Sequence, residues 1–61
     1  MLITMRLRTD NAAFDPDAGP EVSRILRQLA DRTEGGVDAG EELILKDING
    51  NTVGQFNVDE E

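Results

Sequence analysis

The chain has 61 residues and contains neither cysteine nor histidine. Disulfide bridges are therefore excluded, and a zinc site would lack its usual ligands. A chain of this size buries only about 60% of the surface that it exposes when unfolded, so its single apolar core gives a thin margin of stability. We therefore expect one domain over residues 1–61, with self-association as the remaining way to bury more apolar surface.

Two parts of the chain carry apolar residues at a regular spacing. Residues 2–9 alternate between apolar and polar side chains, as half-buried strands do. Residues 20–34 begin with proline and repeat apolar residues every three or four positions, which predicts a helix with one apolar stripe. The remaining prediction is a loop at 10–19, strands at 42–48 and 52–58 around a turn at 49–50, and an acidic tail at 59–61. Phe14 is the one large apolar residue of the loop, so we expect it to fold back onto the core.

The dipeptide Asn49-Gly50 predicts a β-hairpin, because a type I′ turn needs two residues that tolerate positive φ. With a two-residue loop, which we favour, Leu43 faces Phe56, and Ile44 and Ile48 point to the opposite face of the sheet. A loop one residue longer would place Ile44 and Ile48 on the face of Phe56 instead. In either register, apolar side chains lie on both faces of the hairpin.

The predicted order is strand, helix, strand, strand. The third strand can lie between the other two, which gives an antiparallel sheet of order 1-3-2; alternatively, the first two strands pair in parallel through a right-handed crossover. We favour the antiparallel order, an α+β fold in which the single helix packs on one face of the sheet. The other face would be bare in a monomer, and we expect it to form a homodimer through its apolar residues, Leu2, Ile44, Ile48 and Val53.

The net charge of −7 is concentrated in the second half of the chain. Residues 1–32 contain five acids and five arginines, whereas residues 33–61 contain eight acids and one lysine. This balance disfavours direct binding to nucleic acid and to anionic membranes. The acids either maintain solubility and protect the hairpin edge, or imitate nucleic-acid phosphate and bind a basic groove of a protein partner. In the second case the candidate partner-binding residues are Asp38, Glu41, Glu42, Asp47, Asp59, Glu60 and Glu61.

No combination of residues typical of an enzyme is apparent. A Ser–His or Cys–His pair is impossible without histidine. Several aspartates lie in the 10–19 loop, where we expect them to be solvated and unsuited to acid–base work. Residues 47–51 resemble the start of a calcium loop, but their glycine comes fourth and not sixth, which favours a simple turn. We therefore predict a protein that is not an enzyme and that needs no cofactor or metal.

A second kind of site, a pocket for a small ligand at the dimer interface, would use Arg6, Arg8, Arg24 or Arg27. Arg24 and Arg27 are three residues apart and so share one side of the predicted helix, where they could hold a phosphate group. Glu21 and Asp31 lie within four residues of this pair, however, and favour a surface of salt bridges.

The first nine residues are too short and too charged for a signal peptide, and no apolar run approaches the ~20 residues of a membrane span. We expect a cytoplasmic protein.

Three stretches carry a resemblance to known proteins: Asp10-Asn11-Ala12-Ala13-Phe14, the Arg-Ile-Leu-Arg-Gln-Leu-Ala run at 24–30, and Asp47-Ile48-Asn49-Gly50-Asn51-Thr52-Val53-Gly54. Together they resemble small proteins of unassigned role that bacteriophages and other mobile elements of bacteria encode. The resemblance covers most of the chain and includes no catalytic signature. It implies an inhibitor of a host defence or nucleic-acid-handling protein in the bacterial cytoplasm, as anti-CRISPR proteins are. Alternatives are a dimer that sequesters a small ligand or nucleotide, and a structural accessory protein.

Overall fold

The computed structural model describes residues 1–60. In chain order its elements are β1 (Leu2–Leu7), the 3-10 helix η1 (Ala12–Phe14), α1 (Gly19–Glu34), β2 (Glu42–Lys46) and β3 (Thr52–Asp59). β3 lies between β1 and β2 and runs antiparallel to both, so the sheet has the order β1-β3-β2. The predicted α+β fold and the antiparallel alternative for the sheet are therefore confirmed.

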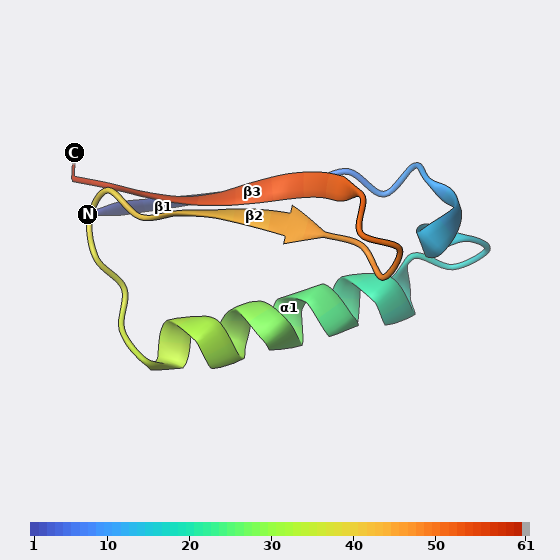
Figure 1. Cartoon of the computed structure of the whole chain (residues 1–61), viewed down its shortest axis with the longest axis horizontal. Coiled ribbons are helices and arrows are strands. Elements are labelled where there is room, and N and C mark those ends of the chain that lie inside the picture. The colour runs from blue at the N-terminus through green and yellow to red at the C-terminus, as the bar shows by residue number, and fades with distance from the viewer. Residues whose placement is uncertain (61) are drawn as a thin grey trace.

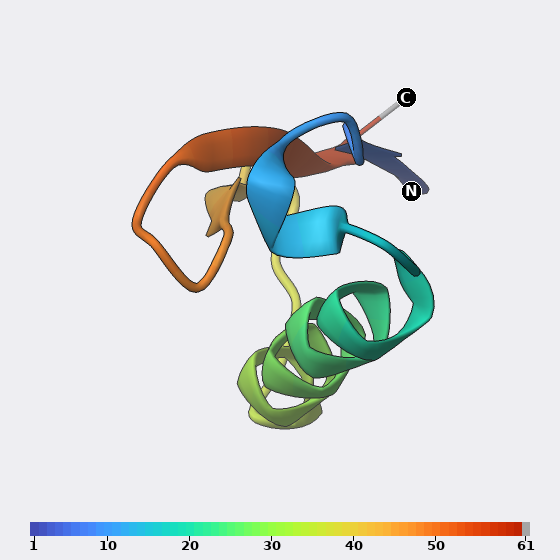
Figure 2. The ribbon, with the colours of Figure 1, turned by 90° about the vertical axis from the view of Figure 1, so that its right-hand side faces the viewer.

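α1 extends along one face of the sheet, and the end-on view shows helix and sheet as two layers (Figures 1 and 2). Pro20 stands at the start of the helix, where its missing N–H costs no hydrogen bond, and Arg32 lies in the last turn, where a cation complements the helix dipole. Within residues 1–60, α1 is neither long nor apolar enough to cross a lipid bilayer.

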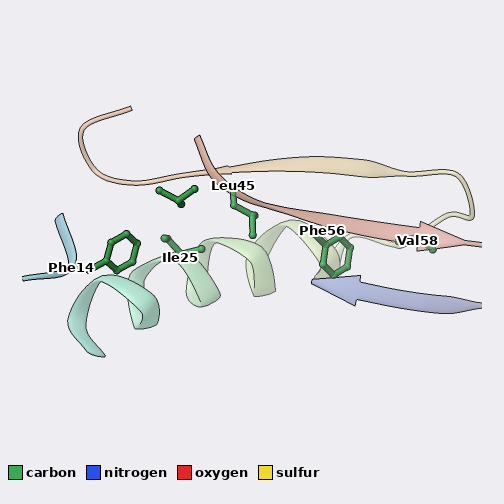
Figure 3. Packing of buried hydrophobic residues seen from close by; sticks show 6 residues of the cluster. Phe14, Ile25, Leu45, Phe56 and Val58 are labelled. Carbon is green, nitrogen blue, oxygen red and sulfur yellow. The ribbon is translucent and has the colours of Figure 1, made fainter. Parts of the chain in front are cut away.

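The core lies between the two layers. Figure 3 shows side chains from η1, α1 and the sheet meeting there; the buried apolar residues are Phe14, Ile25, Leu45, Val53, Phe56 and Val58. Phe14 is only 2% exposed, which confirms that the loop folds back onto the core. Asn11 fixes η1 in place, since its side-chain oxygen accepts a hydrogen bond from the Ala13 amide at 3.1 Å. The loop thus closes one end of the core.

The β2–β3 hairpin differs from the prediction near its turn. Leu43 lies opposite Phe56, as a two-residue loop requires, but β2 ends at Lys46, which lies opposite Thr52. Val53 is therefore an extra residue in β3, and this β-bulge turns its side chain into the core, where it is 4% exposed. The prediction that Val53 lies on the bare face is wrong. Ile48 also lies off the sheet, in the turn, and is 68% exposed.

The face of the sheet that α1 does not cover, called here the outer face, is mostly polar. The strand register places Thr4, Arg6, Gln55 and Asn57 on this face, with Leu2 and Ile44 as its exposed apolar residues. Apolar surface is instead exposed on β1. Ile3 and Met5 share the helix-facing side with Val58 and Phe56, yet they are 49% and 39% exposed. The helix therefore leaves the β1 edge of its own face uncovered.

Candidate functional site

Most of the acids predicted to bind a partner gather at one end of the molecule. β2 begins at Glu42 and β3 ends at Asp59, so the antiparallel pairing of these strands brings their acids together. Two backbone hydrogen bonds extend the pairing, from Gly40 N to Val58 O (2.7 Å) and from Val58 N to Glu41 O (2.9 Å). The start of β1, the end of β3 and the connector after α1 lie at this end (Figure 1). We call the set Asp38, Glu41, Glu42, Asp59 and Glu60 the acidic end; Glu61 lies outside the described residues.

Two members of the acidic end also make contacts within the chain. Glu41 forms an ion pair with Arg32 and accepts a hydrogen bond from the Asp38 amide at 3.2 Å, which ties the connector to the helix. Glu42 accepts a hydrogen bond from the Gln55 side chain at 2.7 Å across the outer face. Asp38, Glu42, Asp59 and Glu60 are all exposed. The acidic end is therefore held in shape by its neighbours and presents most of its charge to solvent.

Asp47 does not belong to this surface, although it was predicted from the sequence to bind a partner together with the other acids. It is 4% exposed and lies at the opposite end of the molecule, in the hairpin turn (Figure 1). Its Oδ1 accepts hydrogen bonds from the amides of Asn49 and Asn51, both at 2.9 Å, and its Oδ2 accepts from the side chains of Asn11 (2.8 Å) and Asn51 (3.1 Å). Four donors satisfy a carboxylate, so Asp47 has no acceptor left for a partner. The prediction that it binds one is corrected.

The acidity of Asp47 follows from this geometry. Burial disfavours its charged form, but the hydrogen bonds from Asn51, Asn11 and Asn49 together outweigh burial and lower its pKa below the ordinary value of 3.8. Asp47 is thus an ionised anchor of the turn. An Asp that bonds to amides two residues onward is typical of turns and was visible in the sequence. The contact with Asn11, 36 residues away, was not.

Glu21 is the second buried acid, at 7% exposure. Arg24 donates two hydrogen bonds to it, at 2.9 and 2.7 Å, and the Ile48 amide donates a third at 2.9 Å. The hydrogen bond from Arg24 is the main reason why the pKa of Glu21 lies below its ordinary value of 4.5, although burial opposes the shift. Arg24 also donates to the Lys46 carbonyl at 3.2 Å, so this pair joins the start of α1 to the hairpin turn. Sequence reasoning anticipated a salt bridge here, but on the solvent side of the helix.

Arg6 and Arg8 have a different environment from Arg24. Within residues 1–60, the ion pairs are Arg24–Glu21 and Arg32–Glu41, so neither Arg6 nor Arg8 has a carboxylate partner there. Both line a shallow hollow of about 500 Å³ on the outer face, together with Ile44, Thr52, Val53, Gly54 and Gln55. The outer face is therefore basic toward the end of β1 and acidic at the opposite end, where Glu42 and Asp59 lie.

Comparisons with known proteins give no match, whether with protein-family models, with curated proteins or with solved structures. The function must therefore be inferred from the residues of the chain itself. Within residues 1–60, no group of three or more acids is arranged to hold a metal ion. The exposed features are the acidic end, the arginine hollow and the uncovered edge of β1.

Proposed function

We propose that this chain is a non-enzymatic binding protein whose acidic end contacts a basic surface of a protein partner. The observation that carries the proposal is the convergence of Asp38, Glu42 and Asp59 from three separate segments onto one exposed end. The two buried acids, by contrast, hold the turn and the start of α1 through hydrogen bonds within the chain. The exposed acids are thus the ones that are available for recognition.

Charge of one sign gathered at one end of a protein attracts an oppositely charged surface before contact. Such steering raises association rates by about 10- to 1,000-fold at low ionic strength, and it falls off over a Debye length of about 8 Å at physiological salt. Backbone pairing of β2 with β3 and the Arg32–Glu41 ion pair hold the backbone of these segments in place, so little loop ordering is needed on binding. A basic groove that normally holds phosphates has the matching charge.

The identity of the partner is a finer proposal. The resemblance of the loop, helix and hairpin segments to small proteins of bacteriophages and mobile elements supports a host defence or nucleic-acid-handling protein as the target. An inhibitor of this kind, like an anti-CRISPR protein, would occupy the groove in place of nucleic acid.

Affinity capture from a bacterial lysate, followed by mass spectrometry, tests the proposal with two matched variants. One removes three charges from the acidic end: Asp38→Asn, Glu42→Gln and Glu60→Gln. The control removes three exposed charges from elsewhere: Asp10→Asn, Asp15→Asn and Asp31→Asn. Each variant changes the net charge from −7 to −4. We expect a basic protein to be retained by the wild type and the control, lost by the acidic-end variant, and released as salt is raised.

Equal retention by the two variants would show that only total charge matters and would contradict the proposal. So would a partner whose affinity is unchanged between low and high salt, because contacts between exposed charges are screened.

A second candidate function is the binding of a small phosphorylated ligand in the arginine hollow. It is favoured by the position of Arg6 and Arg8, which line one hollow without a carboxylate partner among residues 1–60. Titration calorimetry with a nucleoside monophosphate tests it, with Arg6→Gln/Arg8→Gln as the variant that should lose the signal. Absence of heat at millimolar ligand would reject this alternative and leave the acidic-end proposal standing.

A further inference from the structure

We propose that a second copy of this chain docks along the free edge of β1, so that the two sheets join into one sheet of six strands. β1 is an edge strand: β3 pairs with one side of it, and within residues 1–60 no strand covers the other side of β1 (Figure 2). The strand is also unusually apolar for an edge, since Leu2, Ile3 and Met5 are 49%, 49% and 39% exposed. Natural sheet edges that stay single are normally short, charged or covered.

The backbone of β1 is oriented for such pairing. The Arg8 amide donates to the Val53 carbonyl at 2.8 Å, so Arg8 faces β3. Hydrogen-bonding direction alternates along an antiparallel ladder, which leaves the N–H and C=O groups of Ile3 and Met5 pointing away from β3. These groups are the ones that a further strand would meet.

A symmetric antiparallel pair with Thr4 on the two-fold axis satisfies both backbone and side chains. Ile3 then lies opposite the partner's Met5, and Met5 opposite the partner's Ile3, on the helix-facing side. Because directly opposed residues in antiparallel strands point to the same face, both helices lie on one side of the joined sheet. In this register, Ile3 of each copy covers Met5 of the other, and these are the two helix-facing residues that α1 leaves exposed.

The neighbouring surface can receive these side chains. A shallow hollow of about 420 Å³ lies between β1 and α1, and it is lined by Ile3, Leu26, Leu29, Ala30, Thr33, Val37 and Phe56. Leu26, on the rim, is 43% exposed. The partner's Met5 would stand beside Ile3 at this hollow, and methionine adapts well to irregular apolar space.

The charges of the outer face select a second copy as the occupant. In the Thr4-centred register, Arg6 lies beside the partner's Leu2, and Leu2 is paired with Asp59 on β3. Arg6 and the partner's Asp59 are thus two strand spacings apart, about 10 Å between Cα atoms, which an arginine and an aspartate side chain can bridge. The two-fold axis repeats the contact. Arg6 of each chain therefore meets Asp59 of the other, whereas Glu42 lies on β2, the strand farthest from the joint.

Sedimentation equilibrium tests the proposal with a matched pair of variants. Ile3→Lys places a charge at the centre of the proposed interface, whereas Ile44→Lys makes the same change on β2, at a residue of nearly equal exposure (49% and 51%). We expect the wild type to sediment at twice its 6.7 kDa mass. Ile3→Lys should raise the dimer Kd at least about tenfold, and Ile44→Lys should leave it unchanged. Circular dichroism verifies that both variants are folded.

Three results would overturn the proposal. The first is a wild type that stays at 6.7 kDa up to about 1 mM, even if the β1 edge were then found to pair with a strand of another protein. The second is a dimer that Ile44→Lys dissociates and Ile3→Lys does not, which would place the interface on the outer face. The third is a dimer that neither variant weakens. None of these results bears on the acidic-end capture experiment, because Ile3 is not part of the acidic end.

Discussion

Gly54 is the residue at which one methyl group should disturb this fold most. It is the third residue of β3, beside the bulge, and the backbone of β1 lies close against it. A Cβ atom at this position would lie 2.0 Å from the Arg6 carbonyl oxygen, 2.9 Å from the Arg6 carbonyl carbon and 3.1 Å from Leu7 Cα. All three are backbone atoms, so no side-chain rotation relieves the contact. Gly54→Ala must therefore move β1 away from β3.

The size of the effect follows from the required movement. Carbon–oxygen contacts normally begin near 3.3 Å, so the strands must separate by about 1.3 Å. The hydrogen bond from Arg8 N to Val53 O, at 2.8 Å, would then exceed the ordinary limit of about 3.2 Å. Overpacking costs about 1–3 kcal/mol, and each lost hydrogen bond about 0.5–1.5 kcal/mol. We expect Gly54→Ala to lower the free energy of unfolding by about 3 kcal/mol, out of a total of about 3–9 kcal/mol for a chain of this length.

Gly35→Ala is the matched control. Gly35 has φ −78°, which alanine adopts readily, and a Cβ there would lie 3.8 Å from its nearest neighbour, the Arg32 carbonyl oxygen. We expect this variant to be neutral or stabilised by up to about 1 kcal/mol. Urea unfolding followed by circular dichroism, at one fixed protein concentration, measures both. A Gly54→Ala variant within about 0.5 kcal/mol of the wild type would refute the close approach of β1 and β3 at this point.

Two further predictions concern the buried residues. The pKa values of Asp47 and Glu21 are lowered in the folded state, so their stabilising contribution is complete above the ordinary values of 3.8 and 4.5 and is lost as pH falls through the lowered values. The melting temperature should therefore fall between pH 5 and 2, and it should fall by less in Asp47→Asn. An equal fall in the wild type and the variant would contradict the role of Asp47. Phe14→Ala should lower the free energy of unfolding by about 3–5 kcal/mol in urea unfolding followed by circular dichroism, whereas a loss below about 1 kcal/mol would show that Phe14 does not fill the core.

Periodicity was sufficient to predict the main elements of the fold. The alternation in β1 and the three-to-four spacing in α1 are local signals, and the short turn between β2 and β3 makes those two strands antiparallel. The hairpin left open which strand β1 joins, and the structure shows that it is β3. Phe14 was also predictable, since a lone aromatic residue in a polar loop gains most by joining the core.

The errors concern residues whose burial depends on contacts that regular strand alternation does not describe. Val53 reads as an outer-face residue in any regular hairpin, and only the bulge turns it inward. Gly54 was the available signal, because glycine inside a strand often marks a bulge or a close backbone approach. Asp47 reads as one more exposed acid, and its burial depends on Asn11, which is distant in sequence. Exposure of Ile3 and Met5 could not be foreseen either, since it depends on which part of the sheet α1 covers.

The uneven charge of the chain gives the most direct test of how two copies meet. Arg6 and Asp59 lie about 13 Å apart along the sheet within one chain, because four residues separate their rows, but they would be neighbours between two chains. Arg6→Glu and Asp59→Lys each create two repulsive contacts in their own homodimer, whereas an equimolar mixture restores two attractive ones. Sedimentation equilibrium should show each variant alone mainly at 6.7 kDa and the mixture at twice that mass. A mixture that sediments no differently from its separate components would contradict the proposed pairing.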